Sequence, residues 1–206
     1  MRPMVFRRSL SRLSFPGPAA RAPMVAGLAQ PPPAAARFLL GQILVRRDGR
    51  RVRAARIVET EAYLGEGDPA AHSFRGRTPR TAPLWGRPGT VYVYFIYGMH
   101  HCLNLAVERE GAAGCVLIRA AEPVAGLPPG SCRGPGRLCR ALGLDTGDSG
   151  AHIFDRGARL YLREGPPPAR VTVTPRVGIR QAAERRLRFF DADSPEVSGP
   201  RGRRGR

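Results

Sequence analysis

The chain has 206 residues and a formal net charge of +18, from 34 basic and 16 acidic side chains. Every basic residue is arginine, so lysine, the usual amine of Schiff-base chemistry, is missing. Hydrophobic residues make up 42% of the chain, which is enough for one folded domain, and no apolar run approaches the ~18 residues of a membrane span. A charge this positive points to nucleic acid as the partner and gives no reason to expect a membrane.

The two ends of the chain differ in composition from the middle. Residues 1–30 mix arginine, serine, alanine and proline, and no acidic residue precedes Asp48, so we predict a disordered basic arm there. Residues 198–206 form a Gly/Arg-rich tail that we also expect to be disordered. Between them, residues 31–197 have the composition of a single folded domain.

Within this domain the residue patterns predict strands joined by short connections, with a few helices between them. Because strands that follow one another closely favour antiparallel pairing, we predict an α+β fold, with a curved, mainly antiparallel β-sheet and surrounding helices. In chain order the predicted elements are a helix at Ala34–Leu40, strands at Ile43–Arg47 and Val52–Leu64 around an Asp48-Gly49 turn, strands at Thr90–Ile96, His101–Val107 and Cys115–Ala120, a helix at Gly136–Leu142, strands at Ala158–Arg163 and Val171–Thr174, and a helix at Arg180–Leu187.

Metal and redox chemistry have little support in the sequence. The four cysteines form no C-x-x-C pair, and no histidines cluster beside them, so we predict no zinc site and no other metal. Buried thiols in apolar strands are the simplest interpretation of these cysteines. We therefore expect no cofactor.

A carboxylate stands inside an apolar strand at Glu61. The two-residue period of a strand puts Glu59, Glu61 and Tyr63 on one face. Burying a carboxylate is costly unless it is paired or functional, so two interpretations stay open. The face is either solvated, or it presents a general base beside an aromatic ring and the nearby His72.

Three tyrosines gather within six residues. Tyr92 and Tyr94 share one strand face, and Tyr97 precedes Gly98 where a hairpin tip is expected. Tyrosine favours strands in general, so the cluster has a plain structural explanation. In an arginine-rich protein, however, sheet-face aromatics suit stacking on an extruded base, and an aromatic at a hairpin tip suits wedging into a base stack.

The long polar loop between Gly65 and Gly89 is basic. A loop of this length inside a compact domain is usually functional. No acidic residue lies between Asp68 and Glu108, so the loop arginines form a candidate contact surface for DNA phosphates. These arginines are Arg75, Arg77, Arg80 and Arg87.

Together these segments resemble the alkyladenine (3-methyladenine) DNA glycosylase family, from about Pro33 to Pro195. Each motif alone is weak, but the combination is specific. The segments are ARIVETEAYLGEGDPAAHS (Ala55–Ser73), GRTPR (Gly76–Arg80), RPGTVYVYFIYGMHHCLN (Arg87–Asn104), VLIRAAEP (Val116–Pro123), GPGRLCRALG (Gly134–Gly143) and RVGIRQAAERRLRFF (Arg176–Phe190).

The resemblance implies a monofunctional DNA glycosylase that starts base excision repair. It would act as a monomer on double-stranded DNA containing damaged purines, of the 3-methyladenine, 7-methylguanine, ethenoadenine and hypoxanthine class. It implies that Glu61 activates the water that attacks the anomeric carbon, and that Arg119 lies near that water and the flipped nucleotide's backbone. The missing lysines favour hydrolysis over a Schiff-base lyase. In a prokaryote such an enzyme would be cytoplasmic and nucleoid-associated.

The resemblance also implies the residues that hold the base. Tyr63 and Tyr94 would stack on the flipped purine, with His72 on its opposite side offering a hydrogen bond. Asn104 would narrow the pocket against the exocyclic amine of guanine. Tyr97 would fill the gap left in the duplex.

Two departures and two alternatives accompany this interpretation. His100 and His101 stand where aromatic residues are common in the family, and the tryptophan usual in the late helix is missing. A non-enzymatic RNA- or DNA-binding protein would explain the charge equally well, but not Glu61 among aromatics. A formyltransferase-like binding domain that has lost its activity would share the fold.

Overall fold

The strand β2 (Arg51–Tyr63) is the longest of the sheet and organises it. The protein is represented by a computed structural model that describes residues 13–199. Along one edge, β1 (Ile43–Asp48) pairs with the first half of β2 and β8 (Arg188–Asp191) with the second half. Along the other edge lies β5 (Cys115–Ala125). All of these pairings are antiparallel, as predicted.

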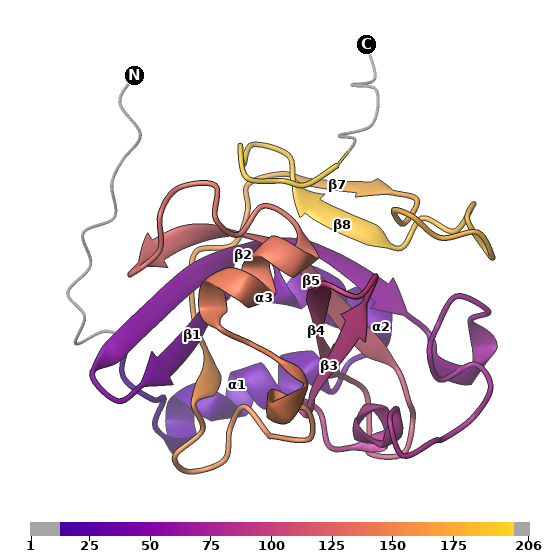
Figure 1. Ribbon diagram of the computed structural model, residues 1–206, viewed down its shortest axis with the longest axis horizontal. Helices are drawn as coiled ribbons and strands as arrows, with labels where there is room; N and C mark the ends of the chain where they lie inside the picture. The colour runs from indigo at the N-terminus through magenta and orange to yellow at the C-terminus, as the bar shows by residue number, and fades with distance from the viewer. Residues whose placement is uncertain (1–12, 200–206) are drawn as a thin grey trace.

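The complete sheet has eight strands in the order β3-β4-β5-β2-β1-β6, with β7 added beside β8. The outer strands are β3 (Val91–Ile96), β4 (His100–Ala106), β6 (Leu160–Arg163) and β7 (Val171–Thr174). Figure 1 shows the sheet curling around the helices. Register shifts between β2 and β5 add to the bend, because each bulge increases the local twist. The predicted α+β fold with a curved antiparallel sheet is confirmed.

Within residues 13–199, two of the three α-helices pack against the sheet and the third packs against one of them. α2 (Pro32–Leu39) lies on β2 and β5, α1 (Pro18–Leu28) contacts α2, and α3 (Pro135–Leu142) packs on β4. The main core forms between these helices and the sheet, with side chains such as Leu39 and Ile118 fully buried. Three short 3-10 helices complete the fold: η2 (Gly65–Gly67), η3 (Ala82–Trp85) and η4 (Thr146–Asp148).

The N-terminal arm differs from the prediction. Helix α1 lies within residues 1–30, which we expected to be disordered, and it buries Met24 and Leu28. These side chains are four residues apart, so they lie on one face of the helix. The arginine- and proline-rich composition conceals this spacing. Residues 1–12 lie outside the described part of the chain, as do residues 200–206 of the predicted tail.

The last predicted helix, Arg180–Leu187, is wrong. The segment contains turns, and Ala182 has a positive φ of 49°, which a helix does not allow. It leads into β8, a strand that the patterns did not predict. Leu187 is buried, and Arg188 pairs with Glu61 across the sheet. The unpaired edge of β2 therefore decides the local structure, against the helix propensity of the segment.

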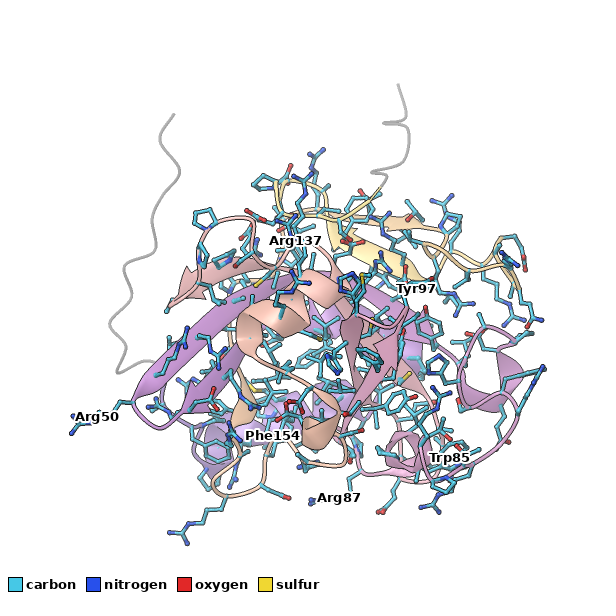
Figure 2. The ribbon with its side chains drawn as sticks, viewed as in Figure 1. Arg50, Trp85, Arg87, Tyr97, Arg137 and Phe154 are labelled. Carbon is cyan, nitrogen blue, oxygen red and sulfur yellow. The ribbon has the colours of Figure 1, made fainter. Side chains whose placement is uncertain are left out.

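The other predicted elements are confirmed with small changes at their ends. The predicted turn at Asp48-Gly49 joins β1 to β2, with Gly49 at a φ of 59°. Figure 2 shows Arg50 projecting from the tip of this hairpin. A search of residues 13–199 finds no helix with the length and apolar character needed to cross a membrane.

Candidate active site

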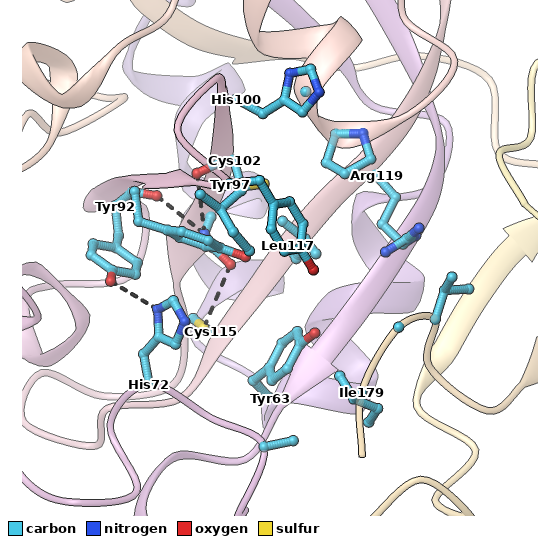
Figure 3. Close-up of a pocket in the computed structure, with 18 residues that line it drawn as sticks. Tyr63, His72, Tyr92, Tyr97, His100, Cys102, Cys115, Leu117, Arg119 and Ile179 are labelled. Carbon is cyan, nitrogen blue, oxygen red and sulfur yellow. Dashed lines mark hydrogen bonds between the residues drawn. The ribbon is translucent and has the colours of Figure 1, made fainter. Parts of the chain in front are cut away.

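A cavity of about 370 Å³ opens where β2, β3, β4 and β5 meet the loop that follows β2. Most of the predicted catalytic and substrate-binding side chains line this one cavity, together with Tyr97, which was predicted to contact DNA. They are Tyr63, His72, Tyr94, Tyr97, Asn104 and Arg119. In Figure 3, His72 and Arg119 face the cavity from opposite sides.

Glu61 lies directly behind the cavity wall. Its side chain is completely buried in β2. One carboxylate oxygen, Oε2, accepts a hydrogen bond from the Tyr63 hydroxyl at 3.0 Å. The other, Oε1, accepts the backbone N–H of Val177 at 2.8 Å and lies 3.2 Å from Nη1 of Arg119. All three donors line the cavity, so the carboxylate is bound entirely by groups that face the substrate space.

Burial affects the protonation of both Glu61 and Tyr63. Burial raises the pKa of Glu61, while Arg119 and the hydrogen bonds from Val177 and Tyr63 oppose that rise. Burial also raises the pKa of Tyr63 far above its ordinary value, so its hydroxyl keeps its proton and donates to Glu61. A carboxylate with a raised pKa, held by a guanidinium and a phenol, is a stronger base than an exposed one and is suited to accept a proton.

A buried ion pair supports Tyr63 from behind. Arg176 packs over the ring with its guanidinium carbon 4.6 Å from the ring centroid. It also pairs with Asp68 through two hydrogen bonds, one of them 2.9 Å from Nη2 to Oδ1, and both side chains are fully buried. This pair ties the loop after β2 to the segment before β8. The segment thereby brings Val177 to Glu61.

The opposite wall is aromatic. Nδ1 of His72 lies 2.9 Å from the Tyr92 hydroxyl, and the His72 ring meets the Tyr94 ring edge-on at a centroid distance of 4.4 Å. Burial, together with the nearby Arg80, lowers the pKa of His72, so the imidazole is neutral at pH 7. Burial raises the pKa of Tyr92 to about 12. This wall is therefore uncharged and aromatic, and its rings can contact a base by stacking or edge-on.

The cavity floor carries an amide held in one orientation. Asn104, on β4, is 3% exposed. Its Nδ2 donates to the carbonyl oxygens of Tyr92 at 3.3 Å and Cys102 at 3.4 Å. Its Oδ1 lies 4.0 Å from the Cys115 sulfur. These contacts leave little freedom to the amide, so it can discriminate between groups that enter the cavity.

Tyr97 stands at the tip of the β3–β4 hairpin, as expected. It is 78% exposed and adopts a positive φ of 55°, a strained conformation for a residue with a side chain. Figure 2 shows it on the outer surface above β3 and β4. His100, one of the two departures from the family pattern, follows on the same hairpin and lines the cavity. The hairpin thus joins the cavity to an exposed aromatic tip.

The loop arginines divide into two groups. Arg75, Arg77 and Arg80 are exposed, and none of them forms an ion pair with an acidic side chain in the described part of the chain. Arg87 instead pairs with Asp155 at 2.9 Å on the surface. The three unpaired guanidiniums lie on the loop that also carries His72 into the cavity wall.

Sequence reasoning missed the buried supports of the site. Glu59 is not on a solvated face but completely buried, and Arg188 lies 2.6 Å from it. The shared strand face of Glu59 and Glu61 was a signal for this, because two neighbouring carboxylates on a buried face need cations. Asp68 and Arg176 left no comparable signal, since they are 108 residues apart.

Among residues 13–199, no group of three or more histidine, cysteine, aspartate or glutamate side chains is placed to hold a metal ion. All four cysteines are free and buried.

Comparison with known proteins identifies the family of the chain. The family model of methylpurine-DNA glycosylase matches residues 26–195. A relative from Myxococcus xanthus is 47% identical over 184 residues, covering 85% of this chain and 94% of its own. Relatives from Koribacter versatilis (46% over 180 residues, 80% and 87% covered) and Methanocella arvoryzae (43% over 178 residues, 79% and 88% covered) share its name, "Putative 3-methyladenine DNA glycosylase". The chain belongs to the methylpurine-DNA glycosylase family.

Proposed function

We propose that the protein is a monofunctional DNA repair glycosylase. It flips alkylated or deaminated purines out of duplex DNA and hydrolyses their N-glycosidic bond, leaving an abasic site. The substrate class comprises 3-methyladenine, 7-methylguanine, ethenoadenine and hypoxanthine. The observation that carries the proposal is the buried carboxylate of Glu61, bound by Tyr63, Arg119 and Val177, all of which line the cavity.

In the proposed reaction a water molecule sits between the flipped nucleotide and Glu61. The carboxylate accepts a proton from this water while the oxygen of the water bonds to the anomeric carbon. The bond from that carbon to the purine nitrogen breaks, and its electron pair leaves with the base. A purine methylated at N3 or N7 carries a positive charge and leaves as a neutral base, so for it the enzyme mainly needs to place the water. A neutral base such as ethenoadenine or hypoxanthine must also take up a proton from water as it leaves. Arg119, 3.2 Å from Glu61, orients the carboxylate.

Binding of the flipped base would use the aromatic side chains of the cavity. The rings of Tyr63 and Tyr94 would stack on the purine and His72 would lie against its other side, with each stacked base worth roughly 1–3 kcal/mol. This gain offsets the few kcal/mol that unstacking costs. Tyr97 would occupy the gap in the duplex, and the fixed amide of Asn104 would oppose the exocyclic amine of guanine.

The absence of lysine favours hydrolysis over lyase chemistry. A glycosylase that also cleaves the backbone needs an amine to form a Schiff base, and without lysine only the α-amino group could supply one. If the DNA strand stays intact until it is treated with alkali, the enzyme is a hydrolase. Cleavage of the strand without alkali would contradict this.

The test is excision from a duplex with one ethenoadenine, followed by alkaline cleavage of abasic sites. We expect the Glu61→Gln variant to bind the duplex like the wild type and to excise about 10²- to 10⁴-fold more slowly, because the proton acceptor is lost. Glu122→Gln, on the partner strand β5 and away from the cavity lining, is the matched control and should keep full activity. A wild type that binds the duplex without excision would instead identify a binding protein.

A further inference from the structure

Glu59 is a second buried carboxylate, to which the reaction above assigns no role. It lies two residues before Glu61 on the same face of β2, and its side chain is completely buried. Its Oε1 accepts hydrogen bonds from Nε of Arg119 at 3.0 Å and Nε of Arg188 at 2.6 Å. Its Oε2 accepts the backbone N–H of Ser198 at 2.6 Å. Every oxygen of this carboxylate is therefore engaged by a donor.

Arg119 connects the two carboxylates. Its Nε donates to Glu59, while its Nη1 lies 3.2 Å from Oε1 of Glu61. Because a guanidinium is planar and rigid, a hydrogen bond at Nε determines the direction in which Nη1 points. The position of the cation beside Glu61 thus depends on a bond made at Glu59.

On its other side, Glu59 is joined to the end of the folded domain. Nη2 of Arg188 donates to the carbonyl oxygen of Ser198 at 2.6 Å, and its Nη1 to the Thr174 hydroxyl at 3.2 Å. Val197 is 1% exposed and packs in a small core cluster with Val58. The segment around Ser198 is accordingly locked to the same carboxylate that holds the cavity arginine.

We propose that Glu59 is a positioning residue for base excision: it holds Arg119 in register with Glu61 and couples this pair to the C-terminal segment at Ser198. The proposal rests on the proposed function, in which Glu61 is the base. A purely structural ion pair would not need to share its arginine with the reacting carboxylate. The two carboxylates and the two guanidiniums of Arg119 and Arg188 also balance in charge, as a buried network requires.

The arrangement has a consequence for the pH dependence of excision. The negative charge of Glu59 raises the pKa of Glu61, but this effect is smaller than those of burial, of Arg119 and of the hydrogen bonds from Val177 and Tyr63. Loss of Glu59 therefore acts on Glu61 mainly through Arg119: when the guanidinium moves away, its lowering effect on the pKa of Glu61 is lost, and the base becomes protonated at a higher pH. The titratable and charged groups that act on Glu61 are Glu59 and Tyr63 from β2, Arg119 from β5, Cys102 from β4 and Arg176 from the segment before β8.

The experiment measures single-turnover excision of ethenoadenine against pH for the wild type and Glu59→Gln. Glutamine keeps the size of the side chain but loses its charge and one acceptor. We expect excision at about pH 7.5 to slow about 10- to 100-fold, as misplacement of a catalytic group by up to about 1 Å does. We expect duplex binding to stay within about threefold and the acid limb of the profile to move to higher pH. A wild-type rate, or a slower rate with an unmoved acid limb, overturns the proposal.

Two further variants keep the result decisive. Glu59→Asp retains the charge but shortens the reach to Arg119, so excision should slow and the acid limb should again move to higher pH. If Glu59→Gln does not fold, a wild-type rate for Glu59→Asp overturns the proposal by itself. Glu122→Gln, which removes an ion pair to Arg56 on the same two strands, should change neither rate nor profile.

Failure of the proposed function would look different. It would show as no excision by the wild type, or as full activity of Glu61→Gln. An inactive Glu61→Gln beside a normal Glu59→Gln contradicts only the positioning role.

Discussion

At the scale of single residues, the site depends on how Glu61 is solvated by protein groups. Burial alone would favour its neutral form, which is no use as a base. A phenol, a backbone N–H and a guanidinium replace the lost water and favour the charged form. Each donor therefore adjusts the pH at which the carboxylate becomes active, and each can be tested by removing it.

We predict that Tyr63→Phe moves the acid limb of the excision profile to higher pH. The hydroxyl that donates to Glu61 lowers the pKa of that carboxyl, so its loss raises the pKa and leaves the base protonated over a wider range. The ring remains for stacking, so the rate near pH 8 should change less than the rate near about pH 6. Single-turnover rates across pH measure the effect.

The control is Tyr161→Phe, which removes a buried hydroxyl bonded to the carbonyl oxygen of Leu13 at 2.6 Å. Tyr161 does not line the cavity, and its loss should leave the pH profile in place. An unmoved acid limb in Tyr63→Phe would mean that the hydroxyl does not act on Glu61. Glu59→Gln should move the limb in the same direction, but it should also slow excision at about pH 7.5, which separates the two effects.

At the scale of elements, the segment before β8 is held to the cavity by one buried ion pair. Asp68 follows β2, and Arg176 precedes β8. Burial acts to raise the pKa of Asp68, but hydrogen bonds from Arg176 and from backbone N–H groups outweigh it, so the pKa lies below its usual value. The pair therefore stabilises the fold above pH ~4, and this contribution is lost as the pH falls through the folded-state pKa.

We predict that Asp68→Asn lowers the free energy of unfolding at pH 7 by about 3–5 kcal/mol, because the charge of Arg176 then stays buried and unpaired. The difference from the wild type should shrink as the pH drops below ~4. Urea unfolding at several pH values measures it. The exposed pair of Arg87 and Asp155 provides the control, since Asp155→Asn should cost at most about 1 kcal/mol. Equal losses in both variants would contradict a special role for the buried pair.

Some of these elements could be predicted from the sequence and others could not. β2 and the β3–β4 hairpin were predictable, because alternation and turn residues are local signals. β8 was not, since an arginine-rich stretch becomes a strand only when it meets the free edge of β2. Helix α1 was hidden by its composition, and only the burial of Met24 and Leu28 against the rest of the core makes it part of the domain.

At the scale of the whole molecule, the arginines behind the net charge of +18 fall into two kinds, those with an acidic partner inside the protein and those without. Many arginines have internal partners. Arg46, Arg53 and Arg159 surround Asp48, and Arg159 above all, by its hydrogen bond, holds the pKa of that carboxyl at about 2. Other arginines, such as Arg75, Arg77 and Arg80, have no acidic partner within residues 13–199. Only the arginines without an acidic partner have a guanidinium that is free to bind DNA phosphates.

We predict that Arg75→Ala, Arg77→Ala and Arg80→Ala each reduce the salt dependence of duplex binding. Each lost phosphate contact should lower the magnitude of the slope of log K against log salt by about 0.9. Arg50→Ala, at the β1–β2 hairpin tip and on the other side of the view in Figure 2 from Tyr97, is the control and should leave the slope unchanged. Titrations at several salt concentrations measure it. If all four variants keep the slope of the wild type, the loop arginines do not contact DNA phosphates.

The amino-acid sequence by itself determined the class of partner, the antiparallel sheet and the strand that carries Glu61 and Tyr63, because charge, alternation and motif order are properties of neighbours along the chain. Tertiary structure decided the rest. It buried Glu59, brought Arg119, Arg188 and Ser198 to it, and paired Asp68 with Arg176. Which cation balances which buried carboxylate depends on contacts between residues that are far apart in sequence, so no local pattern contains it.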